Sequence, residues 1–262
     1  MIVVSPDLVY KHVRGSELLL RAYNLLESDD EVQELISMSN VMAVSRLKYN
    51  DHGIVHSRIV AGSSLELFEL LLSAGLRPTT VVNGTARSID EAKLIVLMAS
   101  YLHDIGNAIH RDNHELLGAL LAKDILDRLL PEIVLTDDKR RLVALRQEIM
   151  HAIYATETSV QALTMEAGVV KIADGTDMAE GRARIPYKLG KLDMHAVSAL
   201  SVKRVYLSKG VDRPARIDVV MNDYAGLFQI EAVLRPKIMT SGLEKYVEVF
   251  IRVGDSERRV FP

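Results

Sequence analysis

The stretch from residue 99 to residue 119 reads ASYLHDIGNAIHRDNHELLGA, and we take it as the centre from which the fold can be predicted. An apolar helix ends here at the adjacent pair His103 and Asp104, and a Gly-Asn turn follows. Two more histidines, His110 and His114, arrive as the next apolar helix begins. Three histidines and a carboxylate between two core helices raise the question of a metal site.

The sequence on both sides of this stretch has the apolar periodicity of helices. Ser16 and Ser88 are expected N-caps, and Gly75 followed by Pro78 is a stop signal for the helix between them. Helices are predicted at about residues 15–27, 31–47, 54–74, 88–102, 113–130, 137–155 and 159–174. The fold class is therefore expected to be mainly α, a helical bundle.

The composition changes after about Leu192. Segments 201–207, 215–221 and 246–253 are rich in β-branched residues between turn signals, which predicts strands. Between the last two, Leu227 to Leu234 fits a short helix that Pro236 and Gly242 would end. We predict a helical domain over residues 1–192 and a small α+β domain (β-β-α-β) over 193–262, with the boundary in the polar segment 184–195.

The composition also excludes several kinds of site and partner. The 262 residues include no cysteine, so disulfides, thiolate ligands and cysteine nucleophiles are excluded. The net charge of -3 gives no nucleic-acid signature. No window reaches the roughly 18 apolar residues of a membrane span, and Pro6 and Asp7 interrupt the N-terminus too early for a signal peptide. We expect a soluble, cytoplasmic protein and leave a homo-oligomer open.

Four ionisable side chains fall on helix faces that should point to the core, because residues three, four or seven positions apart share one side of a helix. With apolar neighbours on the same face, they are His56 (Val60, Leu67), His103 (Val96, Ala99), His114 (Leu121, Ile125) and Asp174 (Leu163, Ala167, Val170).

Buried carboxylates at Asp104 and Asp174 would need compensation, and no lysine or arginine aligns on these inner faces. One or two divalent transition metals (Mn, Fe, Ni, Co or Zn) would supply the charge, and Mg²⁺ is also compatible. For each residue alone, the ordinary alternative is a hydrogen-bonded core histidine or a capping aspartate. Four unrelated burials of this kind explain the pattern less well than one metal centre does.

The other histidines have weaker patterns. His151 lies roughly opposite the apolar stripe of its helix, and His110 suits a ligand, a proton donor or a surface residue equally. His12, His52 and His195 show no pattern and are interpreted as surface or structural residues.

With His56, then His103 and Asp104, then Asp174 in this order, the chain resembles the HD-domain superfamily of metal-dependent phosphohydrolases, whose signature is H…HD…D. The resemblance covers about residues 40–190 and includes the segments HDIGN, HELLGA and IADGTDMAEGR. It implies an HD-type helical bundle, bound divalent metal and hydrolysis of a phosphate ester or anhydride, with a nucleotide as the expected small-molecule partner.

The finer resemblance is to branches of the superfamily that bind two metals. His114 in HELLGA and His151 in EIMHAIYAT are similar to their two additional histidines. The resemblance then implies that His56, His103 and Asp174 hold one metal, that His114 and His151 hold the other, and that Asp104 bridges them.

The segment after Asp174, with Arg182 and then Pro186-Tyr187, is similar to a stretch of the HD-GYP phosphodiesterases. Asn107 stands where those proteins usually have a lysine, and the GYP motif is absent. Cyclic di-GMP is therefore not implied as the substrate.

The resemblance also suggests roles in hydrolysis by a metal-activated water. We expect Asp104 to orient or bridge, and His110 to protonate the leaving group. Positive charge for phosphate is expected from Lys171 and Arg182, for which a solvated polar face is the alternative. Further candidates are Arg111, Arg184, Lys188 and Lys191.

Two other functions remain open at this stage. Some HD proteins are di-iron oxygenases with the same ligand set, so the ligands alone do not separate hydrolysis from oxidation. Alternatively, the metal site is structural and the C-terminal unit binds an effector or partner.

Overall fold

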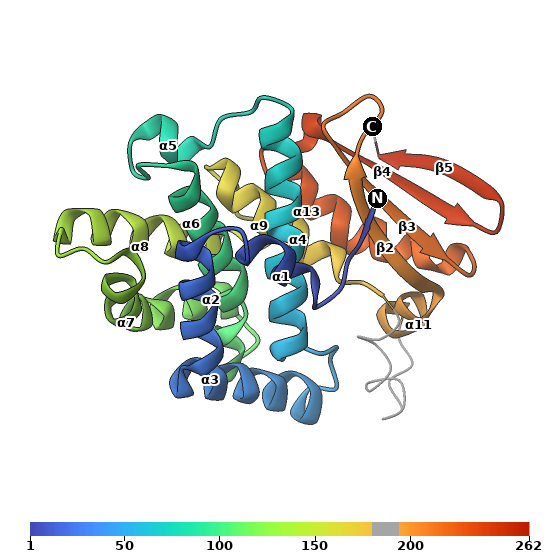
Figure 1. Ribbon diagram of the computed structural model, residues 1–262. Helices are drawn as coiled ribbons and strands as arrows, with labels where there is room; N and C mark the ends of the chain where they lie inside the picture. Colours follow the sequence, from blue (N-terminus) through green and yellow to red (C-terminus); the bar gives the residue numbers. More distant parts are fainter. Residues whose placement is uncertain (180–193, 262) are drawn as a thin grey trace.

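Helices form most of the chain, and a five-stranded sheet lies at one side of them (Figure 1). The structure is a computed structural model that describes residues 1–179 and 194–261. Within the described residues, none of the helices has the length and apolar character needed to cross a membrane.

The helices before residue 180 account for every helix predicted there, with two short additions. They are α1 (Leu8–Val13), α2 (Glu17–Ser28), α3 (Asp30–Asn40), α4 (Ile54–Ser73), α5 (Thr79–Asn83), α6 (Ile89–Leu102), α7 (His114–Val134), α8 (Lys139–Tyr154) and α9 (Met165–Thr176). The additions are α1 and α5, and a π-helical turn, Val41–Arg46, continues α3. The mainly α fold class is thus confirmed.

Side-chain caps fix several helix starts. Ser16 and Ser88 accept hydrogen bonds from the backbone N–H groups of Leu19 and Glu91, as predicted. The predicted start of α9 at residue 159 was wrong, because Thr164 caps the helix and α9 begins only at Met165. Leu163 is consequently outside the helix and 73% exposed, so it does not share a buried face with Asp174.

The helices that matter for the site lie side by side. α4 contacts both α6 and α9, and α6 also contacts α9. Each brings fully buried apolar residues to the core, such as Phe68 of α4, Leu97 of α6 and Val170 of α9. The polar side chains described below therefore sit on rigid, packed elements.

The sheet has the order β1-β2-β3-β4-β5. Its strands are β1 (Ile2–Val3), β2 (Val202–Lys209), β3 (Ala215–Met221), β4 (Val247–Val253) and β5 (Ser256–Phe261). β3 and β4 pair in parallel and the other neighbours are antiparallel. The predicted β-β-α-β unit is present, whereas β1 and β5 were not predicted from the sequence.

The connection between β3 and β4 is helical, as a parallel pair requires. It consists of α12 (Leu227–Gln229), a π-helical turn (Ile230–Leu234) and α13 (Arg235–Met239). Pro236 was expected to end this helix, but it lies at the second residue of α13, and the helix continues to Met239.

The sheet region and the helical bundle contact each other closely. α13 and the preceding π-helical turn lie against α9, and β1 from the start of the chain pairs with β2 (Figure 1). α11 (Met194–Ser201) leads into β2. The domain boundary predicted at residues 192 and 193 touches the segment outside the described residues and stays a prediction.

Candidate metal centre

Three neighbouring elements bring four histidine and aspartate side chains to one buried point. His56 comes from the first turn of α4, His103 and Asp104 directly follow α6, and Asp174 lies in the last turn of α9. His56 and His103 are each 1% exposed, and Asp104 is 4% exposed. The side chains of His56, His103 and Asp174 thus point inward, as helix periodicity predicted.

The potential ligand atoms have the mutual spacing of groups around a single ion. His56 Nε2 lies 3.1 Å from His103 Nε2, 3.2 Å from Asp104 Oδ2 and 3.3 Å from Asp174 Oδ1. His103 Nε2 lies 3.5 Å and 3.6 Å from the same two carboxylate oxygens. Ligands about 2.1 Å from a cation lie about 3.0 to 3.4 Å apart in octahedral or tetrahedral geometry. The four side chains, called the tetrad below, fit a divalent metal.

The hydrogen bonds of the two imidazoles support this fit. His56 Nδ1 lies 2.7 Å from Asp177 Oδ2, and His103 Nδ1 lies 2.8 Å from the carbonyl oxygen of Ser100. Because both partners only accept hydrogen bonds, each neutral ring carries its proton on Nδ1 and turns an Nε2 lone pair inward. Two lone pairs 3.1 Å apart repel unless a cation lies between them. Donation from Nδ1 to a carboxylate or carbonyl is typical of metal-binding histidines.

His52 contacts the same centre, although no sequence pattern predicted this position. Its Nδ1 lies 2.6 Å from Asp104 Oδ2, a hydrogen-bond distance that is shorter than the usual separation of two ligands. We therefore assign His52 to orienting Asp104, although His52, His56 and Asp104 also lie close enough together to hold an ion. His52 is 7% exposed, so of the two interpretations given for it, surface or structural residue, only the structural one applies.

The electrostatics keep Asp104 ionised. Burial alone would raise the pKa of its carboxyl, but the neighbouring His103 and His52 outweigh burial and hold the pKa well below its usual range. Asn107 Nδ2 donates to Asp104 Oδ1 at 3.0 Å. Asn107, at the position where the HD-GYP proteins usually have a lysine, thus donates a hydrogen bond to the carboxylate of Asp104.

His114, at the start of α7, faces the other side of Asp104. Its Nε2 lies 3.3 Å from Asp104 Oδ1, and its Nδ1 lies 3.0 Å from Glu115 Oε2. Burial lowers the pKa of His114, but these two carboxylates raise it to about 9, while nearby Arg111 opposes the rise. His114 is therefore positively charged at neutral pH when no metal is bound.

Two glycines allow α7 to approach the turn that carries Asp104. A Cβ on Gly106 would lie 1.9 Å from the carbonyl oxygen of His114, and a Cβ on Gly118 would lie 3.2 Å from the backbone N of Gly106. The two glycines thus permit a close approach of two backbones, which places His114 beside Asp104.

Lys237, from α13, is the second contact that the sequence did not predict. Its Nζ donates to Asp174 Oδ2 at 2.8 Å. Burial would raise the pKa of Asp174, but the charge of Lys237 is the largest opposing effect, and the pKa lies well below its usual range. Lys237 belongs to a unit distant in sequence, so helix periodicity around Asp174 gave no indication of it.

A cavity of about 220 Å³ opens onto this centre. It is lined by His52, Asp104, Arg111, His114, Glu115, Thr158, Asp174, Ala232, Val233 and Lys237. Arg111 and Lys237 thus line the same cavity as the two carboxylates of the tetrad.

Two predicted residues, His151 and His110, lie away from the centre, and other predicted residues fall outside the described part of the chain. His151 Nε2 accepts a hydrogen bond from the backbone N of Leu163, so its pairing with His114 around a second metal is not supported. The side chain of His110 is 58% exposed. Arg182 lies outside the described residues, as do Arg184, Lys188, Lys191 and the side chain of His195.

Lys171 requires a correction. It is fully buried, and its Nζ donates to the backbone carbonyls of Glu157, Thr158 and Val160. Burial, together with the charge of Lys237, lowers its pKa to about 8. Its ammonium group therefore stabilises the turn before α9 and does not line the cavity.

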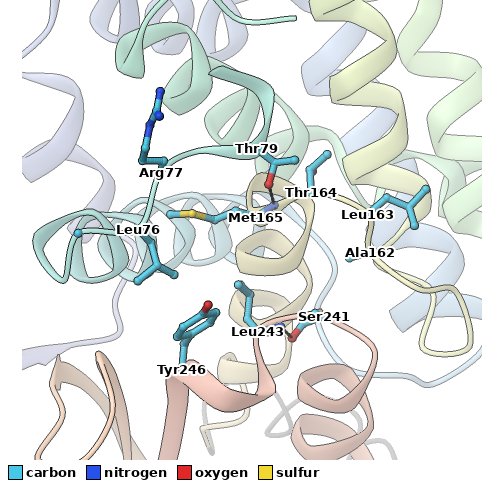
Figure 2. Close-up of a pocket in the computed structure, with 12 residues that line it drawn as sticks. Leu76, Arg77, Thr79, Ala162, Leu163, Thr164, Met165, Ser241, Leu243 and Tyr246 are labelled. Atoms are coloured by element: carbon cyan, nitrogen blue, oxygen red, sulfur yellow. Dashed lines mark hydrogen bonds between the residues drawn. The ribbon is translucent and has the colours of Figure 1, made fainter. Parts of the chain in front are cut away.

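A larger cavity of about 490 Å³ lies elsewhere, between the end of α4, the start of α9 and the turn before β4 (Figure 2). Its lining includes no histidine and no carboxylate. Thr79 Oγ1 accepts a hydrogen bond from the backbone N of Met165, and Figure 2 shows Arg77 turned away from Leu243 and Tyr246. Metal chemistry therefore belongs to the smaller cavity.

The fold and the site together define a helical-bundle protein with a buried histidine and aspartate cluster that could hold a divalent metal. A family model described as HD domain matches residues 54–179, the span that contains the whole tetrad. The chain belongs to this family, whose members generally are metal-dependent phosphohydrolases.

One curated relative is uncharacterized protein MJ1020 of Methanocaldococcus jannaschii. It is 41% identical over 239 residues, which cover 91% of this chain and 90% of that protein. No solved structure matches the chain significantly. The match to this relative, 239 residues long, is much longer than the HD match.

Proposed function

We propose that the protein is a metal-dependent phosphohydrolase or phosphodiesterase that cleaves a phosphate ester or anhydride of a small molecule, such as a nucleotide. The observation that carries the proposal is the tetrad, whose ligand atoms lie 3.1 to 3.6 Å apart and whose two carboxylates line a cavity together with Arg111 and Lys237. Membership of the HD-domain family supports the same class of reaction.

The cavity residues suit a phosphoryl group. Arg111 presents a guanidinium, the group that pairs best with phosphate oxygens, and Lys237 adds a second positive charge. The volume of about 220 Å³ is below the roughly 300 Å³ at which pockets for whole small-molecule ligands begin. We infer that the reacting phosphoryl group enters the cavity and that the remainder of the substrate stays at its mouth.

A bound divalent cation would polarise phosphoryl oxygens and make water more acidic. The chain's own groups would prepare this chemistry. Asp177 and Ser100 hold the proton of each tetrad imidazole on Nδ1, and His52 orients Asp104. His52 also lines the cavity and is a better placed proton carrier than the exposed His110.

The proposal can be tested on protein loaded separately with Mn²⁺, Co²⁺, Fe²⁺, Ni²⁺ or Zn²⁺. The substrates are bis(p-nitrophenyl) phosphate, p-nitrophenyl phosphate, nucleotides and cyclic dinucleotides, assayed without oxygen. We expect metal-dependent release of p-nitrophenol, phosphate or nucleotide. Absence of hydrolysis, together with oxygen consumption by the iron form on a polyol or phosphonate, would refute the proposal in favour of an oxygenase.

A further inference from the structure

Lys237 connects the C-terminal unit to the candidate metal centre. It lies on α13, is 9% exposed, and donates at 2.8 Å both to Asp174 Oδ2 and to the backbone carbonyl of Thr156. Two fixed acceptors on different elements define the position of this ammonium group. The residue lies well outside the span that matches the HD-domain family, residues 54–179.

The two oxygens of Asp174 consequently have different partners. Oδ1 lies 3.3 Å from His56 Nε2 and 3.6 Å from His103 Nε2, whereas Oδ2 carries the contact with Lys237. A carboxylate can bind a cation through one oxygen or through both. An ammonium group bonded to Oδ2 competes with a metal for that oxygen.

The local sequence of α9 makes room for this contact. Gly175 follows Asp174 directly, and a Cβ at this position would lie 3.1 Å from Leu234 Cδ1 and 3.3 Å from Lys237 Cδ. A side chain at residue 175 would therefore press on the stem of Lys237 and on the π-helical turn before α13. The same turn contributes Ala232 and Val233 to the wall of the cavity.

We propose that Lys237 is a positioning residue that keeps Asp174 monodentate, with Oδ1 facing the tetrad and Oδ2 held away from the metal. The inference rests on the metal binding that the proposed function requires. A ligand restricted to one oxygen leaves a coordination position open for water or substrate, which is what distinguishes catalytic from structural metal sites. The C-terminal unit thereby has a task in the site: it supplies the group that sets the coordination number.

The test uses the full chain saturated with Co²⁺, whose visible absorption weakens as its coordination number rises. In Lys237→Met, Oδ2 is free to bind, so we expect the cobalt bands to lose intensity. Lys237→Arg, which retains a cation for Oδ2, should restore the wild-type spectrum. Lys171→Met is the matched control. Like Lys237→Met, it removes a buried ammonium group that donates to backbone carbonyls of residues 156–160, but it leaves the hydrogen bond between Lys237 and Asp174 intact.

A spectrum of Lys237→Met that superimposes on that of the wild type would overturn the inference, as would an equal loss of intensity in Lys171→Met. Should Lys237→Met not fold, Lys237→Gln, whose shorter neutral side chain removes the ammonium group from Asp174 Oδ2 but remains polar, is expected to show the same loss. Failure of the proposed function is distinguishable, because the wild-type chain itself would then bind no cobalt, or would bind it without hydrolysing any phosphate ester.

Discussion

The two oxygens of Asp104 face different surroundings. Oδ2 lies within 3.5 Å of both tetrad histidines, in a set that Asp174 completes. Oδ1 meets His114 at 3.3 Å, and among the described residues no group of three potential ligands includes His114. The difference shows that the protein builds one ion site from its own side chains, whereas an ion on the Oδ1 side would depend on water or substrate for most of its ligands.

The largest effect should come from the Oδ2 side. His103→Ala removes one of four ligands, so we expect metal affinity to fall by more than about 100-fold, beyond the cost of losing an outer partner. Hydrolytic activity should fall with it. Metal content after gel filtration, measured alongside far-UV circular dichroism to confirm folding, checks this result. Full metal retention by the folded variant would contradict the assignment of His103 as a ligand.

On the Oδ1 side, protonation of His114 should make the free energy of unfolding of the metal-free protein depend on pH. The pKa of His114 rises from 6.5 to about 9 on folding, so its charged form stabilises the fold fully below about pH 6.5. This contribution, at most about 3 kcal/mol, is lost as the pH rises through 9. Urea unfolding between pH 6 and 10 measures it. In His114→Gln this part of the pH dependence should vanish, and an unchanged profile would contradict the assignment.

A smaller effect is expected at Asp177, which is hydrogen-bonded to a tetrad histidine but is not itself a ligand. Asp177→Asn weakens the group that holds the proton of His56 on Nδ1, so metal affinity should fall about 10- to 100-fold. Isothermal titration with Co²⁺ measures the change. Asp112→Asn removes a carboxylate that is 83% exposed, and serves as the control with unchanged affinity. Equal affinities for both variants would argue against the proposed orientation of His56.

The smallest effect is expected at His151. His151→Ala should leave metal affinity and activity within about two-fold of the wild type, because the ring bonds the backbone N of Leu163 instead of the cluster. The lost hydrogen bond should lower the free energy of unfolding by about 1 kcal/mol. A loss of metal comparable to that of His103→Ala would place His151 in the centre after all.

Much of the fold and part of the site followed from helix periodicity. The rule that residues three or four apart share a face predicted the inward positions of His56, His103 and Asp174, and it also placed His151 off the apolar stripe. At His151, the family resemblance pointed to a ligand role, and the geometry agrees with the periodicity instead. Local patterns succeed here because these side chains are presented by regular, packed helices.

The remainder depends on tertiary contacts that no local pattern records. His52 lies in an irregular turn before α4, and Lys237 reaches Asp174 across 63 residues of sequence. The prediction for Lys171 was wrong for a different reason. The residue lies on the same helix as Asp174, as expected, but its amine donates to backbone carbonyls. For Lys171, closeness to the motif in sequence therefore did not predict contact with the site.

Anomalous X-ray scattering from crystals grown with Co²⁺ tests the central claim most directly. The account predicts a strong anomalous peak about 2.0 to 2.3 Å from His56 Nε2, His103 Nε2 and one oxygen each of Asp104 and Asp174. The absence of a peak there, with the two imidazoles hydrogen-bonded to each other or to the carboxylates, would contradict it.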